Sequence, residues 1–412
     1  ESHRLKEGRL MQPILKGMRI IEASAFIAAP MCGTSLAQLG AEVIRFDPIL
    51  GGLDYSRWPI TKEGDSIYWA EMNKGKKSIA INTKSAEGRE IVSELITLPG
   101  DQNGIFSTNL PATGWLSYES LCKKRADLIQ HEIIGNRNGR TALDYTVNAK
   151  VGFPLITGAE DNVEPINHVL PAWDIATAYH AAINILAADR HRLKTGKGQK
   201  IKLALSDVAL SSISNLGFVG DVIVNNSKRK RIGNFLYGAF GKDFITRDNI
   251  RMMIVAITPK QWRQLLDSIK VVDSIRKLEK RMKLNFSIEG DRYEARKEIY
   301  EIVQGAIGAK SIDELEKIFN SHNVCWERYQ TVEELVKNDE DICNENQFFQ
   351  KRTHPKIGRY PVCSGASDFK GIEKLPACVG PTLGQHTDEI LAEILGLSEA
   401  KIGILHDQGI VA

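Results

Sequence analysis

Hydrophobic and polar positions along the first fifty residues predict a strand, a loop, a helix and a second strand. Residues 18–22 form an apolar run, and Pro30 suits the first turn of the helix that follows. Gly40 ends this helix before a second apolar run at residues 42–46. The chain therefore opens with a βαβ pattern.

The same alternation returns further along the chain. It predicts a strand at residues 77–81, a helix at 85–96, a long helix at 174–192, a strand at 200–205 and a helix from Ser206. Strands that alternate with helices of this length are typical of a parallel sheet. We therefore expect an α/β fold for the main domain.

A second region, at about residues 227–337, has a different pattern. A stretch rich in glycine and aromatic residues at 233–240 precedes one apolar strand at 252–257 and several highly charged helices. The tail then returns to a helical pattern, capped near Thr387 and ended by Gly396. We expect a large domain at residues 1–226, an inserted smaller α/β domain at 227–337, and a linker with a return to the large domain at 338–412.

Composition excludes several classes of protein. The formal net charge is only +3, with both signs mixed along the chain, so we expect neither nucleic acid nor a membrane surface as a partner. No apolar stretch reaches the roughly 18 residues that a membrane-spanning helix needs. The six cysteines form no CxxC pair and have no histidine at ligand spacing, which argues against a zinc site and a disulfide framework. A cytoplasmic location is expected.

Two features could carry chemistry, but neither is specific by itself. Residues 73–78 (NKGKKS) form a basic turn whose lysines can reach phosphate oxygens, although such turns are also common on protein surfaces. Asp174 stands where a helix begins, and there the helix dipole favours an ionised carboxylate, but an ordinary helix-start aspartate has the same pattern. The segment after the first strand contains neither GxGxxG nor a phosphate-binding loop, which disfavours NAD and ATP.

Four segments, taken in order, resemble the class III CoA-transferases, the carnitine dehydratase and bile-acid-inducible CoA-transferase family. They are LAQLGAEVIRFDP at 36–48, NKGKKSIAIN at 73–82, LPAWDIATAYHAA at 170–182 with TGKGQKIKLALSDVAL at 195–210, and PTLGQHTDEILAEILG at 381–396. They extend over nearly the whole chain. Four separated motifs in family order are more specific than any single one.

The resemblance implies a Rossmann-like large domain with an inserted small domain, an interlocked homodimer, an acyl-CoA substrate, and no cofactor beyond coenzyme A. It makes Asp174 the nucleophile. The residues that it implies for CoA binding are Phe26, Ile27, Ala28, Lys74, Gly75, Lys76, Lys77 and Asn109. The chain departs from the family pattern at Ala29, where the family has glycine, and at residues 110–114, which replace a glycine-rich stretch.

Further segments resemble one branch of the family, whose members move CoA between the two carboxylates of one dicarboxylic acid. These segments are residues 51–61, 134–158, 167–174 and 233–240. A substrate with a free carboxylate needs a cation in the pocket. Arg57, Arg137 and Arg140 are candidates because they lie in these segments.

Three alternatives use related sites. A CoA-transferase with a separate acceptor acid would need the same nucleophile. An α-methylacyl-CoA racemase needs a histidine beside the aspartate to move a proton, and the resemblance puts Leu143 at that position. A non-catalytic CoA-binding protein would be favoured if Asp174 were inaccessible.

Overall fold

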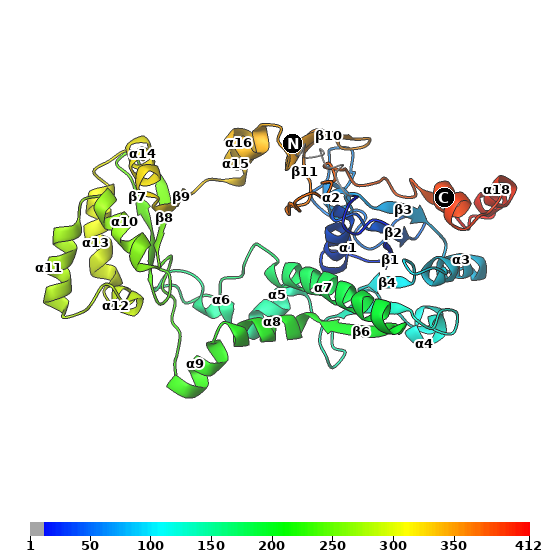
Figure 1. Cartoon of the computed structure of the whole chain (residues 1–412), viewed down its shortest axis with the longest axis horizontal. Helices are drawn as coiled ribbons and strands as arrows, with labels where there is room; N and C mark the ends of the chain where they lie inside the picture. Colours follow the sequence, from blue (N-terminus) through cyan, green and yellow to red (C-terminus); the bar gives the residue numbers. More distant parts are fainter. Residues whose placement is uncertain (1–11) are drawn as a thin grey trace, which may run out of the picture. The chain divides into compact units, whose positions relative to one another are not determined.

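The computed structural model describes residues 12–412, which form two compact units (Figure 1). Of the described residues, the first unit contains 12–151, 169–220 and 339–412. The second unit contains residues 152–168 and 221–338. Each unit has its own hydrophobic core and is described by itself.

The first unit is built on a sheet of six parallel strands in the order β3-β2-β1-β4-β5-β6. The strands are β1 (Arg19–Ala23), β2 (Glu42–Asp47), β3 (Lys77–Ala80), β4 (Ile105–Thr108), β5 (Ile129–Ile134) and β6 (Gln199–Ala204). The strand order reverses between β1 and β4. In open α/β sheets, ligands bind outside the carboxyl ends of the strands at this reversal.

Helices cover both faces of this sheet (Figure 1). On one face, α1 (Ala28–Gln38) and α7 (Ala172–Thr195) pack together over β1, β2, β4 and β5 through small side chains such as Ala29, Ala178 and Ala181. On the other face lie α3 (Ala86–Thr97), α4 (Tyr118–Leu121), α17 (Thr387–Glu389) and α18 (Glu399–Asp407). Because both faces are covered, the central strands bury apolar side chains on both sides, such as Ile20 and Ile21 of β1 and Val43 and Ile44 of β2.

Shorter elements complete the first unit. They are α2 (Ile67–Met72), η1 (Gly114–Leu116), α5 (Asp144–Val151), α8 (Leu205–Asn215), α16 (Glu340–Cys343), β10 (Phe349–His354), β11 (Gly358–Cys363) and a π-helical turn at Ile390–Ile394. Among the described residues, no single helix is both long and apolar enough to cross a bilayer. Only α8 taken together with the following α9 (Phe218–Asn225), across a bend, meets that criterion.

The second unit has an antiparallel sheet of β7 (Phe240–Ile245), β8 (Arg251–Ala256) and β9 (Cys325–Arg328). Its helices are α6 (Phe153–Ile156), α10 (Pro259–Ser268), α11 (Val272–Met282), α12 (Glu289–Glu294), α13 (Arg296–Ile307), α14 (Ile312–His322) and α15 (Val332–Asn338). The charged helices are amphipathic, and their apolar faces bury Phe240, Phe244 and Phe319 in one core.

The division into units differs from the expected boundaries at residues 152–168, which the sequence pattern placed in the large domain. The Gly233 N–H donates to the Gly158 carbonyl, and the Arg231 guanidinium donates to the carbonyls of Thr157 and Asn162. These bonds join residues about seventy positions apart, so no local pattern could indicate them. The tail helix expected through residue 395 is also interrupted, by the π-helical turn.

Candidate active site

The segment between β1 and α1 is held in one shape by side chains from other loops. Asn109, which follows β4, accepts the Ala25 N–H at 2.9 Å and donates to the Ala25 carbonyl at 2.7 Å. Phe26 has a φ of 68°, which is unusual for a bulky side chain. Its N–H donates to Asp54 Oδ2 at 2.9 Å. Asn109 therefore shapes the loop that was expected to line the CoA site.

A buried network of charges lies beneath this segment. Arg45 pairs with Asp47 at 2.8 and 3.0 Å and with Asp54 at 2.7 Å, and it also donates to Asn73 Oδ1 at 3.2 Å. Asn73 Oδ1 also accepts a hydrogen bond from Lys76, which joins the basic turn at residues 73–78 to this network. Each charge has a partner of opposite sign, as burial requires.

Asp174 lies in the first turn of α7, as the sequence predicted. Asp144, the first residue of α5, accepts the N–H groups of Trp173 and Asp174 at 2.7 and 3.0 Å through one carboxylate oxygen. The Trp173 indole donates to Asn148 Oδ1 at 3.2 Å. The start of α7 is therefore fixed by two buried side chains of α5.

Burial and the nearby charge of Asp144 raise the pKa of Asp174 to about 6, while the Arg57 charge acts in the opposite direction. The helix dipole by itself predicts a lowered pKa for Asp174. It is outweighed because the carboxyl group is largely removed from water and faces a second carboxylate. At pH 7 Asp174 is still mostly ionised, and its higher basicity makes it a stronger nucleophile than an exposed aspartate.

The raised pKa predicts how activity depends on pH. The nucleophile must be ionised, so kcat/KM should rise with pH up to about 6 and fall roughly tenfold per pH unit below it. In Asp144→Asn the repelling charge is lost, so the acid limb should move to lower pH. Rates measured between pH 4.5 and 8, with circular dichroism to confirm folding, test this. A wild-type limb at the usual aspartate pKa near 4 would contradict it.

Of the three arginines proposed for the substrate carboxylate, Arg57 is the one whose charge acts on Asp174. Its guanidinium lies 5.5 Å from the Phe26 ring centre and 5.3 Å from that of Tyr68. Burial raises the pKa of Tyr68 to about 12, so this phenol stays protonated. Arg137 pairs with Asp207 at 2.9 and 3.0 Å, and Arg140 is exposed on the same loop.

A cavity of about 340 Å³ lies at the carboxyl ends of β1 to β4, at the reversal of strand order. Its walls are mostly apolar, and they include Leu53, Leu110, Pro111 and Trp115. Residues 110–114 are where the chain departs from the glycine-rich family pattern, so that departure gives this cavity larger side chains. Its position and lining suit a flat ring or an apolar ligand arm.

The lysines of residues 74–77 lie at the amino end of β3, away from this cavity. Lys74 pairs with Glu71 at 2.9 Å, and Lys77 pairs with Glu42 and Glu389 at 2.8 and 2.7 Å. Lys76 is fully buried against Glu22 at 2.6 Å, which conflicts with the phosphate contact that the sequence predicted for it. Gly75 has a φ of 72°, as expected of a glycine that turns this loop.

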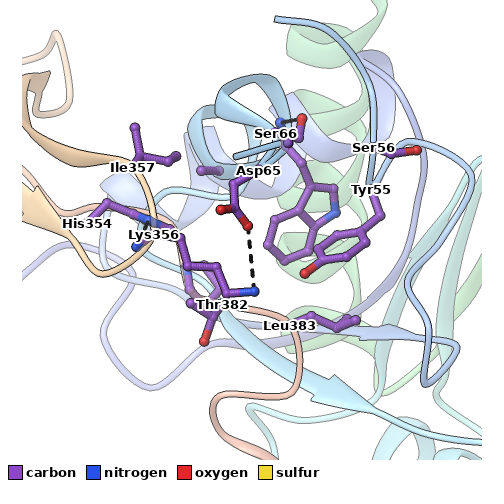
Figure 2. Close-up of a pocket in the computed structure, with 13 residues that line it drawn as sticks. Tyr55, Ser56, Asp65, Ser66, His354, Lys356, Ile357, Thr382 and Leu383 are labelled. Carbon is purple, nitrogen blue, oxygen red and sulfur yellow. Dashed lines mark hydrogen bonds and ion pairs between the residues drawn. The ribbon is translucent and has the colours of Figure 1, made fainter. Parts of the chain in front are cut away.

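A smaller cavity of about 80 Å³ lies between residues 55–70 and the β10–β11 hairpin. Figure 2 shows Asp65 and Lys356 facing each other across it, 3.6 Å apart. Among the described residues, neither Asp174 nor a predicted CoA-binding residue lines it. At this volume it is too small for a CoA moiety.

The fold and the aspartate at the start of α7 agree with a match to a family model. Residues 15–387 match CoA-transferase family III, and the chain belongs to this family. It is 48% identical over 403 residues to 2-methylfumaryl-CoA isomerase of Chloroflexus aurantiacus, covering 98% of both chains. It is 26% identical to human succinyl-CoA:glutarate CoA-transferase, covering 96% of this chain and 90% of the relative.

A solved structure shows the same fold. A CAIB/BAIF family protein from Brucella suis superposes with a TM-score of 0.74, covering 94% of this chain and 100% of the other, at 22% identity. The mixed α/β architecture with a parallel sheet is therefore that of the family.

Sequence reasoning missed two aspartates of the site, Asp54 and Asp144. Each binds backbone N–H groups of residues 28 to 30 positions away. No local spacing marks such a pair. The only available signal was that both lie in the segments that set this branch of the family apart.

Proposed function

We propose that the chain is a 2-methylfumaryl-CoA isomerase, which moves CoA from the C1 to the C4 carboxylate of mesaconyl-CoA within one molecule. The observation that carries this proposal is the partly buried Asp174 at the start of α7, with its raised pKa and with Arg57 beside it. The near full-length identity to the Chloroflexus isomerase supports this substrate.

In the first half-reaction, the Asp174 carboxylate attacks the thioester carbonyl and expels CoA thiolate, which leaves a mixed anhydride. The thiolate then attacks the aspartyl carbonyl of the anhydride. This gives an aspartyl-CoA thioester and the free dicarboxylate. One thioester replaces another, so the reaction needs no cofactor beyond coenzyme A.

In the second half-reaction, the other carboxylate of the retained acid attacks the aspartyl thioester and again releases CoA thiolate. The thiolate attacks the substrate carbonyl of the new anhydride, which forms the C4 thioester and regenerates Asp174. Arg57 is exposed, its charge acts on Asp174, and it can hold whichever carboxylate is not reacting. This requires the acid to turn end for end in the pocket.

The remaining predicted residues receive roles in CoA binding. Phe26, Ile27 and Ala28 would lie along the pantetheine arm, and the cavity at the carboxyl ends of β1 to β4 would receive part of that arm. For Lys74 and Lys77 a phosphate contact requires that they first leave their glutamate partners. Asn109 would act by holding Ala25.

We also propose a cytoplasmic, interlocked homodimer. Its support is a set of exposed apolar side chains on α7 and after α8, at Tyr179, Ile183, Leu193 and Leu216. Exposed apolar side chains in this number favour burial against another protein surface. If the proposal is correct, the molecular mass of the protein measured in solution is that of two chains.

The proposed function is tested with mesaconyl-C1-CoA and an excess of isotopically labelled free mesaconate. If the acid stays in the pocket, the C4 product carries no label and added succinate is not acylated, because a retained acid has a high effective concentration. Label that enters the product as fast as isomerisation would favour an intermolecular dicarboxylate CoA-transferase instead. Absence of any C4 product would remove the proposal.

A further inference from the structure

Asp54 has no role in the mechanism proposed above, although its contacts reach two residues of the candidate site. It is completely buried. One carboxylate oxygen, Oδ1, accepts from Arg45 at 2.7 Å, and the other, Oδ2, accepts the Phe26 N–H at 2.9 Å and a longer bond from Arg45 at 3.4 Å. Its main-chain carbonyl accepts the Arg57 N–H at 3.1 Å. A single residue therefore holds the backbones of both Phe26 and Arg57.

The side chains of these two residues form a stack, and the charge of its Arg57 acts on Asp174. The Arg57 guanidinium lies 5.5 Å from the Phe26 ring centre. Phe26 keeps a positive φ of 68°, a conformation that persists only where surrounding contacts enforce it. The bond to Asp54 is such a contact, and it sits at the residue whose ring supports Arg57.

We propose that Asp54 is a positioning residue for the nucleophile: it holds Phe26 and Arg57 as one unit and so keeps the Arg57 charge directed at Asp174. This inference rests on the proposed function, because it takes Asp174 as the nucleophile. Asp54 itself is buried and would not touch the substrate.

The contacts of Arg45 separate this role from a purely structural one. Arg45 has a second partner, Asp47, with two hydrogen bonds of 2.8 and 3.0 Å. Loss of the Asp54 charge therefore leaves Arg45 paired with Asp47, whereas the Phe26 N–H exchanges a carboxylate oxygen for a neutral amide oxygen or for an NH₂ group that cannot accept. Because both Asp54 oxygens face donors, an asparagine there must turn its NH₂ group toward Arg45 or toward Phe26.

The test is the pH dependence of kcat and kcat/KM in Asp54→Asn. If Arg57 moves away, its charge no longer favours the ionised Asp174, so the acid limb should move up by about one pH unit. At pH 7, kcat should fall by about tenfold to a hundredfold, with a smaller change in KM. If Asp54 instead acted on Asp174 directly through its own negative charge, loss of that charge would move the acid limb to lower pH. The direction of the shift therefore separates displacement of Arg57 from a direct charge effect.

A double-mutant cycle with Arg57→Gln completes the test. If Asp54 acts through Arg57, the double variant should be no slower than Arg57→Gln alone. Asp54→Glu keeps the charge but moves the carboxylate by one methylene. It replaces Asp54→Asn in the test if that variant fails to fold, and the acid limb of its pH profile should also move to higher pH. An unchanged limb in whichever variant folds, or additive losses in the cycle, would overturn the inference.

Failure of the proposed function would look different. If Asp174→Asn kept its activity, or if labelled acid entered the product, the mechanism or substrate would be wrong whatever Asp54 does. If exchange depends on Asp174 but uses another acid, the same Asp54 comparison can be made with that acid.

Discussion

Replacing Asp174 by asparagine is expected to abolish CoA exchange, with a loss on the order of 10⁴-fold or more, as when another covalent nucleophile is removed. An amide of the same shape cannot attack a thioester carbonyl. The fold should persist, because the contact that fixes this position is the bond from the Asp174 backbone N–H to Asp144, which the substitution keeps. Hydroxylamine or borohydride trapping should label Asp174 in the wild type only.

The matched control is Asp189→Asn, the same change on the same helix. Asp189 pairs with Arg192 at 2.7 Å near the other end of α7. This variant should retain exchange activity even if it is slightly less stable. Turnover within tenfold of wild type in Asp174→Asn, with mass spectrometry excluding deamidation, would refute the covalent role.

Much of the first unit follows from local patterns. The strand expected at residues 18–22 is observed at Arg19–Ala23, and the strand expected at 42–46 is observed at Glu42–Asp47. The long helix begins two residues before Asp174 and ends at Thr195, where Gly196 takes a positive φ. These elements are predictable because apolar periodicity and a glycine stop both act within a few residues.

The site was predictable to a smaller extent. The Asp174 position follows from a motif, but its pKa depends on burial and on Asp144, which the chain brings close from thirty residues away. The lysine motif indicated which residue types are present but not where their side chains point. A Lys-rich turn indicates solvent contact by composition, and Lys76 instead points beneath α1. Side-chain direction in a loop is decided by tertiary packing, to which a local pattern gives no access.

Gly33 shows how the fold accommodates this buried lysine. A Cβ atom at Gly33 would lie 1.9 Å from Glu22 Oε2 and 3.1 Å from Lys76 Nζ. Only glycine lets α1 approach the ion pair this closely. The Lys76 ammonium also donates to the Pro30 carbonyl at 2.8 Å and to Asn73 Oδ1 at 3.1 Å. All three of its hydrogen bonds are therefore made inside the protein.

Lys76→Ala is therefore expected to destabilise the fold by about 3 to 5 kcal/mol, because it leaves the Glu22 carboxylate buried without its cation. Urea denaturation followed by fluorescence would measure this loss. Lys77→Ala is the matched control from the same loop. Lys77 is only partly buried, and its pairs with Glu42 and Glu389 are open to water. Loss of a pair of this kind costs about 1 kcal/mol or less.

A second variant separates burial of the pair from contact with CoA. In the double variant Lys76→Met, Glu22→Gln both charges are absent, so much of the lost stability should return. If Lys76 instead bound a CoA phosphate, the double variant would regain stability but not affinity, and calorimetric titration with CoA would show weaker binding. A Lys76→Ala protein of nearly wild-type stability that binds CoA at least tenfold more weakly would restore the phosphate contact that the sequence motif predicted. The burial of the ammonium against Glu22 makes us expect the opposite result.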